Sequence, residues 1–180
     1  LPNIAELLKR TPDVTRACRF IGMHGAIYKG YLGNDEIQAE YNVVQNLPAT
    51  KSVFASDLDI TITPLDSCGM IRLLDERYQR LLGGSSISID ELMDNYRIWL
   101  ETIGKSPDIA TSKSSTLFDT VAIYLAFSEE LLEMQQLKVA VDADGKTIIN
   151  EQGKAMNVAT GWKDLEAFYD LLVSRLISAP

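Results

Sequence analysis

Residues 18–23 read CRFIGM and residues 59–63 read DITIT, and these two stretches decide the fold class. Each predicts a short strand, because apolar and β-branched residues dominate it. A helix is predicted between them, from about Pro48 to Ser56. Strand, helix and strand at this spacing indicate a right-handed crossover, which makes the two strands parallel. The sequence therefore predicts an α/β fold with a mainly parallel sheet.

Polar side chains gather in the long loop, residues 24–46, that follows the first predicted strand. Asn34, Glu40 and Asn42 contribute two amides and one carboxylate to it. Open α/β sheets place ligands at loops that leave the carboxyl ends of their strands. Amides and carboxylates bridge neighbouring hydroxyls, so the loop favours a polyhydroxylated ligand. The alternative is that these side chains are solvated or cap a turn, as most loop acids and amides do.

Composition bounds the protein class. The 180 residues suffice for one domain, 1–180, with a sizeable core. The net charge of −8 disfavours nucleic acid and anionic membranes as partners. No apolar run reaches the length of a membrane span, and no signal peptide is visible. Cys18 and Cys68 are predicted to be buried free thiols, which favours a reducing, cytoplasmic location.

The rest of the chain is predicted to form five helices and one β-hairpin. The helices are predicted at residues 2–10, 75–82, 88–103, 116–127 and 162–177, and the hairpin at residues 138–149. Ser88 and Glu91 are interpreted as a capping box for the third of these helices. Its inward stripe is predicted to be Leu92, Tyr96, Trp99 and Ile103. The DADG sequence at 142–145 is interpreted as the hairpin turn rather than the start of a calcium loop, because Lys146 follows it.

Three segments, taken in order and spacing, resemble the nucleoside hydrolase family. They are LPNIAELLKR at 1–10, FIGMHGAIYKGYLGNDEIQAEYNVVQ at 20–45 and DITITPLD at 59–66, with a weaker match in LFDTVAIY at 117–124. The resemblance implies a three-layer αβα sandwich, here incomplete on its N-terminal side. It also implies hydrolysis of the N-glycosidic bond of ribonucleosides, a purine and pyrimidine salvage reaction, in which Ca²⁺ holds the attacking water and the ribose hydroxyls.

The resemblance also assigns site residues. Met23, Asn34, Glu40 and Asn42 match residues that contact the ribose. The alternative for Met23 is a place in the core.

Two residues match calcium ligands. Pro2 stands where the family supplies a backbone carbonyl, and Asp119 matches an aspartate at the start of a helix. The alternative for Asp119 is a capping box with Thr116.

The sequence departs from the family at three points. The family's acidic cluster, of the form DTDPGxDD, does not occur, so we expect that cluster and the catalytic general base to lie upstream of Leu1. Phe118 occupies the position where many members carry a histidine that helps to protonate the leaving base. The single histidine, His24, replaces a glycine and either faces the cleft or is structural.

Three hypotheses follow from the resemblance and its departures. The first is an enzyme that is competent only with an N-terminal partner segment, so that this chain alone is inactive. The second is a silent relative that still binds nucleoside or ribose. The third is a structural half whose first strand exposes an unpaired edge. We also expect a homo-oligomer, with no nucleic-acid or membrane partner.

Overall fold

The computed structural model describes residues 1–178, and these divide into two compact units. The first unit consists of residues 1–71 and 117–163, and the second of residues 72–116 together with the segment from Asp164 onward. The single domain expected over residues 1–180 stays a prediction.

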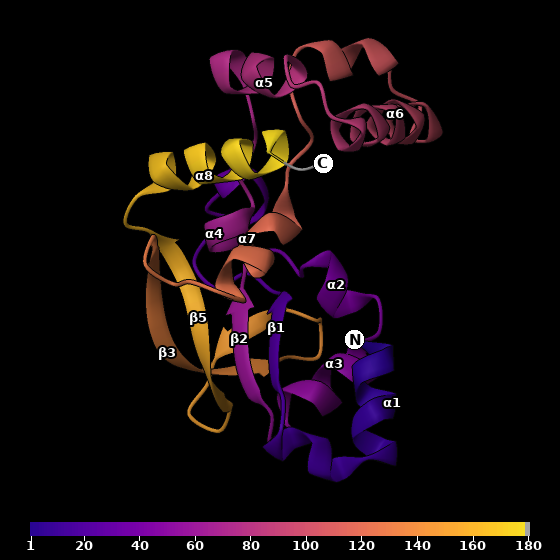
Figure 1. The fold of residues 1–180 in the computed structure, drawn as a ribbon. Coiled ribbons are helices and arrows are strands. Elements are labelled where there is room, and N and C mark those ends of the chain that lie inside the picture. The colour runs from indigo at the N-terminus through magenta and orange to yellow at the C-terminus, as the bar shows by residue number, and fades with distance from the viewer. Residues whose placement is uncertain (179–180) are drawn as a thin grey trace. The chain divides into compact units, whose positions relative to one another are not determined.

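The first unit is built on a five-stranded sheet (Figure 1). Its strands are β1 (Arg19–Met23), β2 (Asp59–Thr63), β3 (Leu132–Val141), β4 (Thr147–Ile149) and β5 (Lys154–Trp162), in the order β1-β2-β5-β3-β4. β1, β2 and β5 are parallel neighbours, whereas β3 is antiparallel to both β5 and β4. The predicted α/β fold with a mainly parallel core and the predicted β3–β4 hairpin are therefore confirmed.

Two features of this sheet differ from the sequence-based expectation. β5 was not predicted, because its polar residues, among them Asn157 and Thr160, break the apolar pattern of a buried strand. β3 begins at Leu132 rather than near Lys138, and its first half is largely exposed on one side. β1 forms one edge of the sheet, and no strand among residues 1–178 pairs with its outer side.

Helices cover the sheet of the first unit. α1 (Pro2–Arg10) and α3 (Leu47–Phe54) lie side by side, and α3 packs on the sheet (Figure 1). The core between them and the strands is formed by buried residues of α3, β2, β3 and β5 and of the turn before β2: Val53, Phe54, Leu58, Ile60, Ile62, Val139, Met156 and Val158. α4 (Leu65–Cys68) and α7 (Phe118–Leu125) pack near β5, β1 and β2. A 3₁₀ helix, η1 (Pro12–Arg16), joins α1 to β1.

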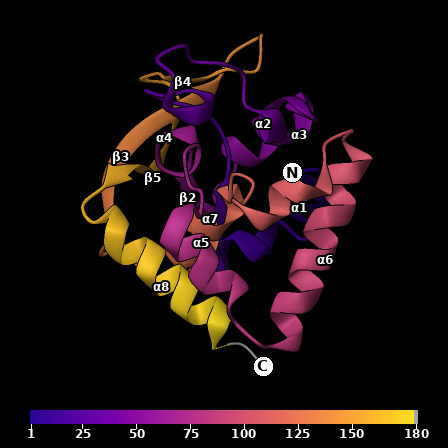
Figure 2. The same cartoon turned by 90° about the horizontal axis from the view of Figure 1, so that it is seen from above.

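The second unit is helical. It contains α5 (Asp75–Leu82), α6 (Ile87–Thr102), the 3₁₀ helix η3 (Pro107–Thr111) and α8 (Leu165–Ile177). Figures 1 and 2 both show α5 beside α8. The hydroxyl of Tyr78 on α5 donates to the carbonyl of Ala110 at 2.8 Å, which fixes η3 against that helix. None of the helices in the described part of the chain is long and apolar enough to cross a membrane.

The predicted inward face of α6 is wrong. Leu92, Trp99 and Ile103 are 43–45% exposed, and the buried residues are Ile89, Met93 and Leu100. The helix carries two apolar stripes of similar spacing, and periodicity alone does not tell which one meets the core.

The predicted cap of α6 is also wrong. The helix is capped by Ser86, whose hydroxyl accepts from the Ile89 N–H at 3.3 Å, and Ser88 lies inside the first turn.

The two cysteines lie in different environments. Both are free thiols, as predicted, but Cys18 is exposed because it precedes β1 instead of lying in it. Cys68 is fully buried at the end of α4, and its thiol donates to the Pro64 carbonyl at 3.2 Å. Burial raises the pKa of Cys68 far above its ordinary value, so this thiol is unreactive.

Candidate ribose-binding site

The loop that leaves β1 is held by side chains from distant elements. The Asp66 carboxylate of α4 accepts from the backbone N–H groups of Ile27 and Tyr28 at 2.8 and 2.7 Å. The Thr147 hydroxyl of β4 accepts from the Ala26 N–H and donates to the Ala26 carbonyl, both at 2.8 Å. Consecutive backbone groups are thus satisfied without a strand partner, and the loop has a defined path at the carboxyl end of β1.

Glu40 closes this loop onto the short helix α2 (Tyr41–Val44). One carboxylate oxygen accepts from the Asn42 N–H at 2.8 Å, and the other from the N–H groups of Gly25 and Val43, each at 3.2 Å. The side chain is 2% exposed. Burial raises the pKa of Glu40 above its ordinary value against the opposing effect of the three donors, and the nearby Asp119 charge raises it further. Glu40 is therefore the N-cap of α2, and its bond to Gly25 connects the end of the loop to its beginning.

Asn42 presents its amide beside Glu40. Its Nδ2 donates to the Met23 carbonyl at 3.1 Å and lies 3.2 Å from the Met23 sulfur. No residue within 1–178 bonds to its Oδ1. Because the donor end is fixed by β1, the acceptor end has a fixed orientation and remains available to a ligand hydroxyl.

A cavity of about 390 Å³ lies where these elements meet. Its lining comes from β1, the loop, α2 and the first turn of α7: Met23, Tyr31, Glu40, Tyr41, Asn42, Phe118 and Asp119. The Tyr31 hydroxyl accepts from the Tyr41 N–H at 2.9 Å, and its ring meets Phe118 edge-on with 6.1 Å between the ring centroids. The residues that line the cavity are thus two acids, one amide, Met23 and three aromatic residues.

Four of the six site residues predicted from the resemblance line this cavity, namely Met23, Glu40, Asn42 and Asp119. Asn34 does not line it; its side chain is exposed and lies 3.5 Å from the Glu36 N–H.

The N-terminal end of the described chain also lies outside the cavity lining. Leu1 is the N-cap residue of α1, and its partly buried side chain packs against the core of the first unit. Pro2 follows it as the first residue of α1, and neither residue lines the cavity. The general base expected upstream of Leu1 lies outside the described residues, so its position stays a prediction.

The capping alternative for Asp119 is wrong. α7 begins at Phe118, its N-cap residue is Leu117, and no side chain caps it. Asp119 therefore lies in the first turn of α7 and is one of the residues that line the cavity.

Sequence reasoning missed Tyr31 and Tyr41 as cavity residues. Tyr41 lies inside the AEYN tetrapeptide of the family resemblance, so its place next to Glu40 and Asn42 was an available signal. The position of Tyr31 in the cavity lining depends on the path of the loop after β1, and no local sequence pattern predicts that path.

A protein family matches nearly the whole chain. The sequence profile described as inosine-uridine preferring nucleoside hydrolase matches residues 1–170. The chain belongs to this family. A search of curated proteins found no match.

Solved nucleoside hydrolases share the fold. A purine-preferring ribonucleoside hydrolase from Gardnerella vaginalis has a TM-score of 0.75 at 23% identity over 97% of this chain and 57% of its own. An inosine-uridine preferring nucleoside hydrolase from Bacillus anthracis has a TM-score of 0.71 at 18% identity over 98% and 57%. A plant nucleoside hydrolase has a TM-score of 0.75 at 16% identity over 99% and 59%. The chain therefore spans less than three fifths of the length of these relatives.

The residues of this nucleoside hydrolase chain do not fit a calcium ion by themselves. No group of three or more His, Cys, Asp or Glu side chains within residues 1–178 is placed to hold a metal. Both oxygens of Glu40 are engaged by backbone donors, which leaves Asp119 as the one cavity carboxylate without such bonds among the described residues. Calcium takes six to eight oxygen ligands. Most of the ligands would have to come from outside this chain.

His24 does not line the cavity. Its ring lies between Phe20 and Phe54, with ring centroids 5.6 and 6.4 Å away, and its Nδ1 is buried without a hydrogen-bond partner. Burial lowers its pKa from 6.5 to about 4, so the ring is neutral at pH 7. The structural interpretation of His24 therefore fits, because this side chain is not among the residues that line the cavity.

We expect Thr147→Val to destabilise the protein by about 2 kcal/mol. The two side chains have nearly the same shape, but valine leaves the buried N–H and C=O of Ala26 unpaired. Urea unfolding followed by circular dichroism measures the loss. Thr102→Val, which removes an exposed hydroxyl bonded to Ile98 on α6, is the matched control and should change little. Equal effects of the two substitutions would contradict the role of Thr147.

Proposed function

We propose that this chain is the ribose-binding portion of a hydrolase that cleaves the N-glycosidic bond of ribonucleosides. The observation that supports this most directly is the single cavity that Glu40, Asn42 and Asp119 line together, although Asp119 lies far from the other two in the sequence. The free Oδ1 of Asn42 would accept from a ribose hydroxyl. The carboxylates would stabilise the positive charge that develops on the sugar ring as the bond to the base breaks.

The proposal requires that residues outside this chain supply part of the catalytic site. The cavity contains no unengaged carboxylate other than Asp119 among the described residues, and no histidine. Because Asp119 is proposed as a calcium ligand, a general base would be supplied from elsewhere, and the chain alone is proposed to give no turnover. Asn34 and Pro2 remain proposed ribose and metal contacts that would require a local rearrangement to reach the cavity.

We propose calcium binding only for a site that also contains ligands from outside this chain. Asp119 would be one ligand and the Pro2 carbonyl a second, with the others contributed from outside residues 1–180. When bound, such an ion orients hydroxyl groups and acidifies water. We propose that the complete assembly works in the cytoplasm, as a homo-oligomer.

Binding of nucleoside to the purified chain tests the cavity. We expect inosine and uridine to give a measurable calorimetric signal, which Asn42→Ala weakens at least about tenfold because a hydrogen bond worth about 1.5 kcal/mol is lost. Asn95→Ala removes an exposed amide on α6 and should leave binding unchanged. Release of base from either nucleoside by the chain alone, with calcium present, would overturn the proposed inactivity. Undiminished binding by Asn42→Ala would overturn the proposed site.

One observation favours a second function, that of a binding protein without chemistry. Phe118 lies on the cavity wall against Tyr31, at the position where many family members carry a histidine. A phenyl ring stacks on a nucleobase but gives it no proton. Saturable binding without turnover in a longer protein that contains the N-terminal acids would favour this function, and clean turnover would reject it.

A further inference from the structure

A second cavity, of about 490 Å³, lies within the helical unit between α5 and α8. Its lining residues are mostly charged: Arg72, Leu74, Asp75, Glu76, Arg77, Arg80, Tyr169 and Asp170. None of them belongs to the ribose-binding cavity, so any ligand here is independent of the function proposed above. Three arginines in one wall are notable in a chain whose net charge is −8.

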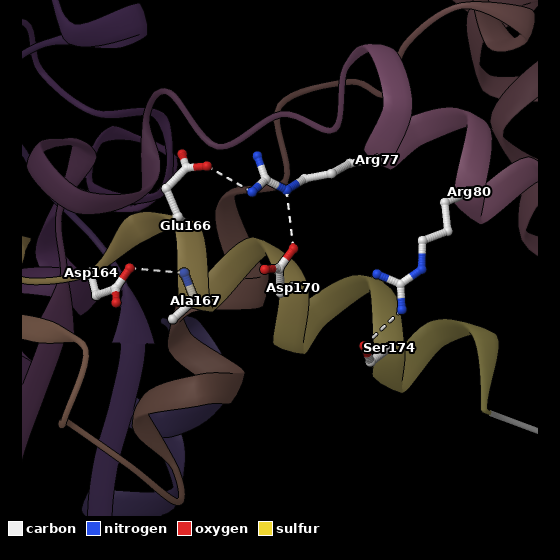
Figure 3. Close-up of polar contacts among 7 residues, drawn as sticks. All are labelled: Arg77, Arg80, Asp164, Glu166, Ala167, Asp170 and Ser174. Atoms are coloured by element: carbon white, nitrogen blue, oxygen red, sulfur yellow. Dashed lines mark hydrogen bonds and ion pairs between the residues drawn. The ribbon is translucent and has the colours of Figure 1, made fainter.

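Arg77 is the arginine whose charge is already balanced. Its guanidinium bonds to Glu166 at 2.7 Å and to Asp170 at 3.3 Å, one turn apart on α8 (Figure 3). It also lies over the Tyr169 ring, 5.2 Å from the centroid. Because three side chains of α8 contact its guanidinium, Arg77 joins α5 to α8 and forms part of the cavity wall.

Arg72 and Arg80 have no such counter-charge. The Arg72 Nε donates to the Thr116 hydroxyl at 3.2 Å, and an Arg80 Nη donates to the Ser174 hydroxyl at 3.2 Å, as Figure 3 shows for Arg80. Neither has a carboxylate within 4.0 Å among residues 1–178. Arg72 is half-buried. A guanidinium remains charged at all accessible pH values and has five donors, so most of the donors of these two side chains have no acceptor among residues 1–178.

The chemistry of the wall selects the ligand class. Two arginines that line one cavity and lack a carboxylate partner suit a tetrahedral dianion, because each guanidinium can form paired hydrogen bonds to phosphate oxygens. Asp75 and Glu76 line the same cavity and would accept hydrogen bonds from hydroxyl groups. We propose that this cavity binds a hydroxyl-bearing phosphate monoester, such as a sugar phosphate, with Arg72 and Arg80 as the phosphate contacts.

Calorimetry with three probes tests the proposal: glucose 6-phosphate, inorganic phosphate and glucose. We expect glucose 6-phosphate to bind with a Kd below about 1 mM, and glucose to give no signal at about 10 mM, because the guanidinium contacts require the anion. Binding should weaken several-fold between about 50 and 500 mM NaCl, as screening predicts. Absence of binding by both phosphate probes at about 10 mM, or binding of glucose as tightly as its phosphate, would overturn the proposal.

Variants locate the site. Arg80→Gln, at an exposed position, should weaken glucose 6-phosphate binding at least about tenfold. Arg72→Lys keeps the charge but loses the planar fork, and it should also weaken binding. Arg97→Gln removes an arginine of α6 that pairs with Asp94 outside the cavity, and it should have no effect. A loss with Arg97→Gln equal to that with Arg80→Gln would assign the binding to general charge and reject this site.

Two further measurements distinguish loss of phosphate binding from loss of folding, and this cavity from the ribose-binding cavity. The melting temperature of each variant without ligand shows whether it is folded, and Arg80→Gln should keep it within a few degrees because its one described bond is to an exposed hydroxyl. Asn42→Ala should retain full glucose 6-phosphate binding. Failure of nucleoside binding would therefore leave this proposal standing, and its own failure would leave the ribose-binding cavity untouched.

Discussion

Replacing Glu40 with alanine is expected to cost about 3–5 kcal/mol of unfolding free energy, the largest effect of any single substitution considered. The substitution removes the acceptor for three backbone N–H groups, those of Gly25, Asn42 and Val43. These donors lie around a side chain that is 2% exposed, so water replaces the carboxylate poorly. The N-cap of α2 is lost in the same step. Urea unfolding at pH 7 measures the change.

Two comparisons separate this explanation from a general effect of removing charge. Glu40→Gln should also be costly, because the amide NH₂ faces a backbone donor whichever way it is turned. Asp119→Ala removes a carboxylate from the same cavity but leaves no donor unpaired among the described residues, so it should stay within about 1 kcal/mol of the parent. A cost for Asp119→Ala as large as that for Glu40→Ala would show that cavity charge, and not the hydrogen bonding of Glu40, decides stability.

Acidification is expected to destabilise the fold through His24. Its pKa is about 4 in the folded protein and 6.5 when the ring is exposed, so the unfolded state binds the proton more readily. The stability that the neutral ring contributes is complete above pH 6.5 and is lost as the pH falls from 6.5 toward 4. Over that interval the loss is about 3 kcal/mol. Unfolding free energies measured at half-unit steps of pH give the slope.

His24→Phe isolates this contribution. Phenylalanine also has a planar ring but carries no titrating group. It has no ring nitrogen, so the buried Nδ1 without a hydrogen-bond partner is removed. Because His24 is the only histidine, no other imidazole titrates in this interval. The loss of unfolding free energy between pH 6.5 and 4 should be about 3 kcal/mol smaller in the variant than in the parent. An unchanged slope would mean that the ring is hydrated in solution and titrates normally.

The parallel core of the fold was predictable because its signals are local. The strands at 19–23 and 59–63 and the helix between them are short, apolar and bounded by turn residues, so periodicity and spacing were sufficient. The hairpin at 139–149 was predicted for the same reason, from two β-branched runs around DADG. The grouping of Glu40 with Asn42 was also local, because the two residues are neighbours in one loop.

The remaining features depend on tertiary contacts that no local pattern contains. β5 has polar residues scattered through its apolar pattern and is held by pairing with β2 and β3, so its own residues do not identify it. α6 has two apolar stripes, and only packing within the helical unit selects between them. The exposure of Cys18 and the absence of Asn34 and Pro2 from the cavity lining depend on where a strand begins and a loop turns, within one or two residues.

The turn of the β3–β4 hairpin adjoins α2, at the end of the loop that follows β1. Gly145 has a φ of 84°, and a side chain there would approach the Val44 methyl carbon of α2 to 2.6 Å. Sequence position alone would suggest this hairpin tip for a grafted epitope or a fluorescent label, because it is short, polar and far along the chain from the loop. An insertion there would instead displace α2 and reshape the cavity wall far upstream in the sequence, so reporter groups belong elsewhere on the molecule.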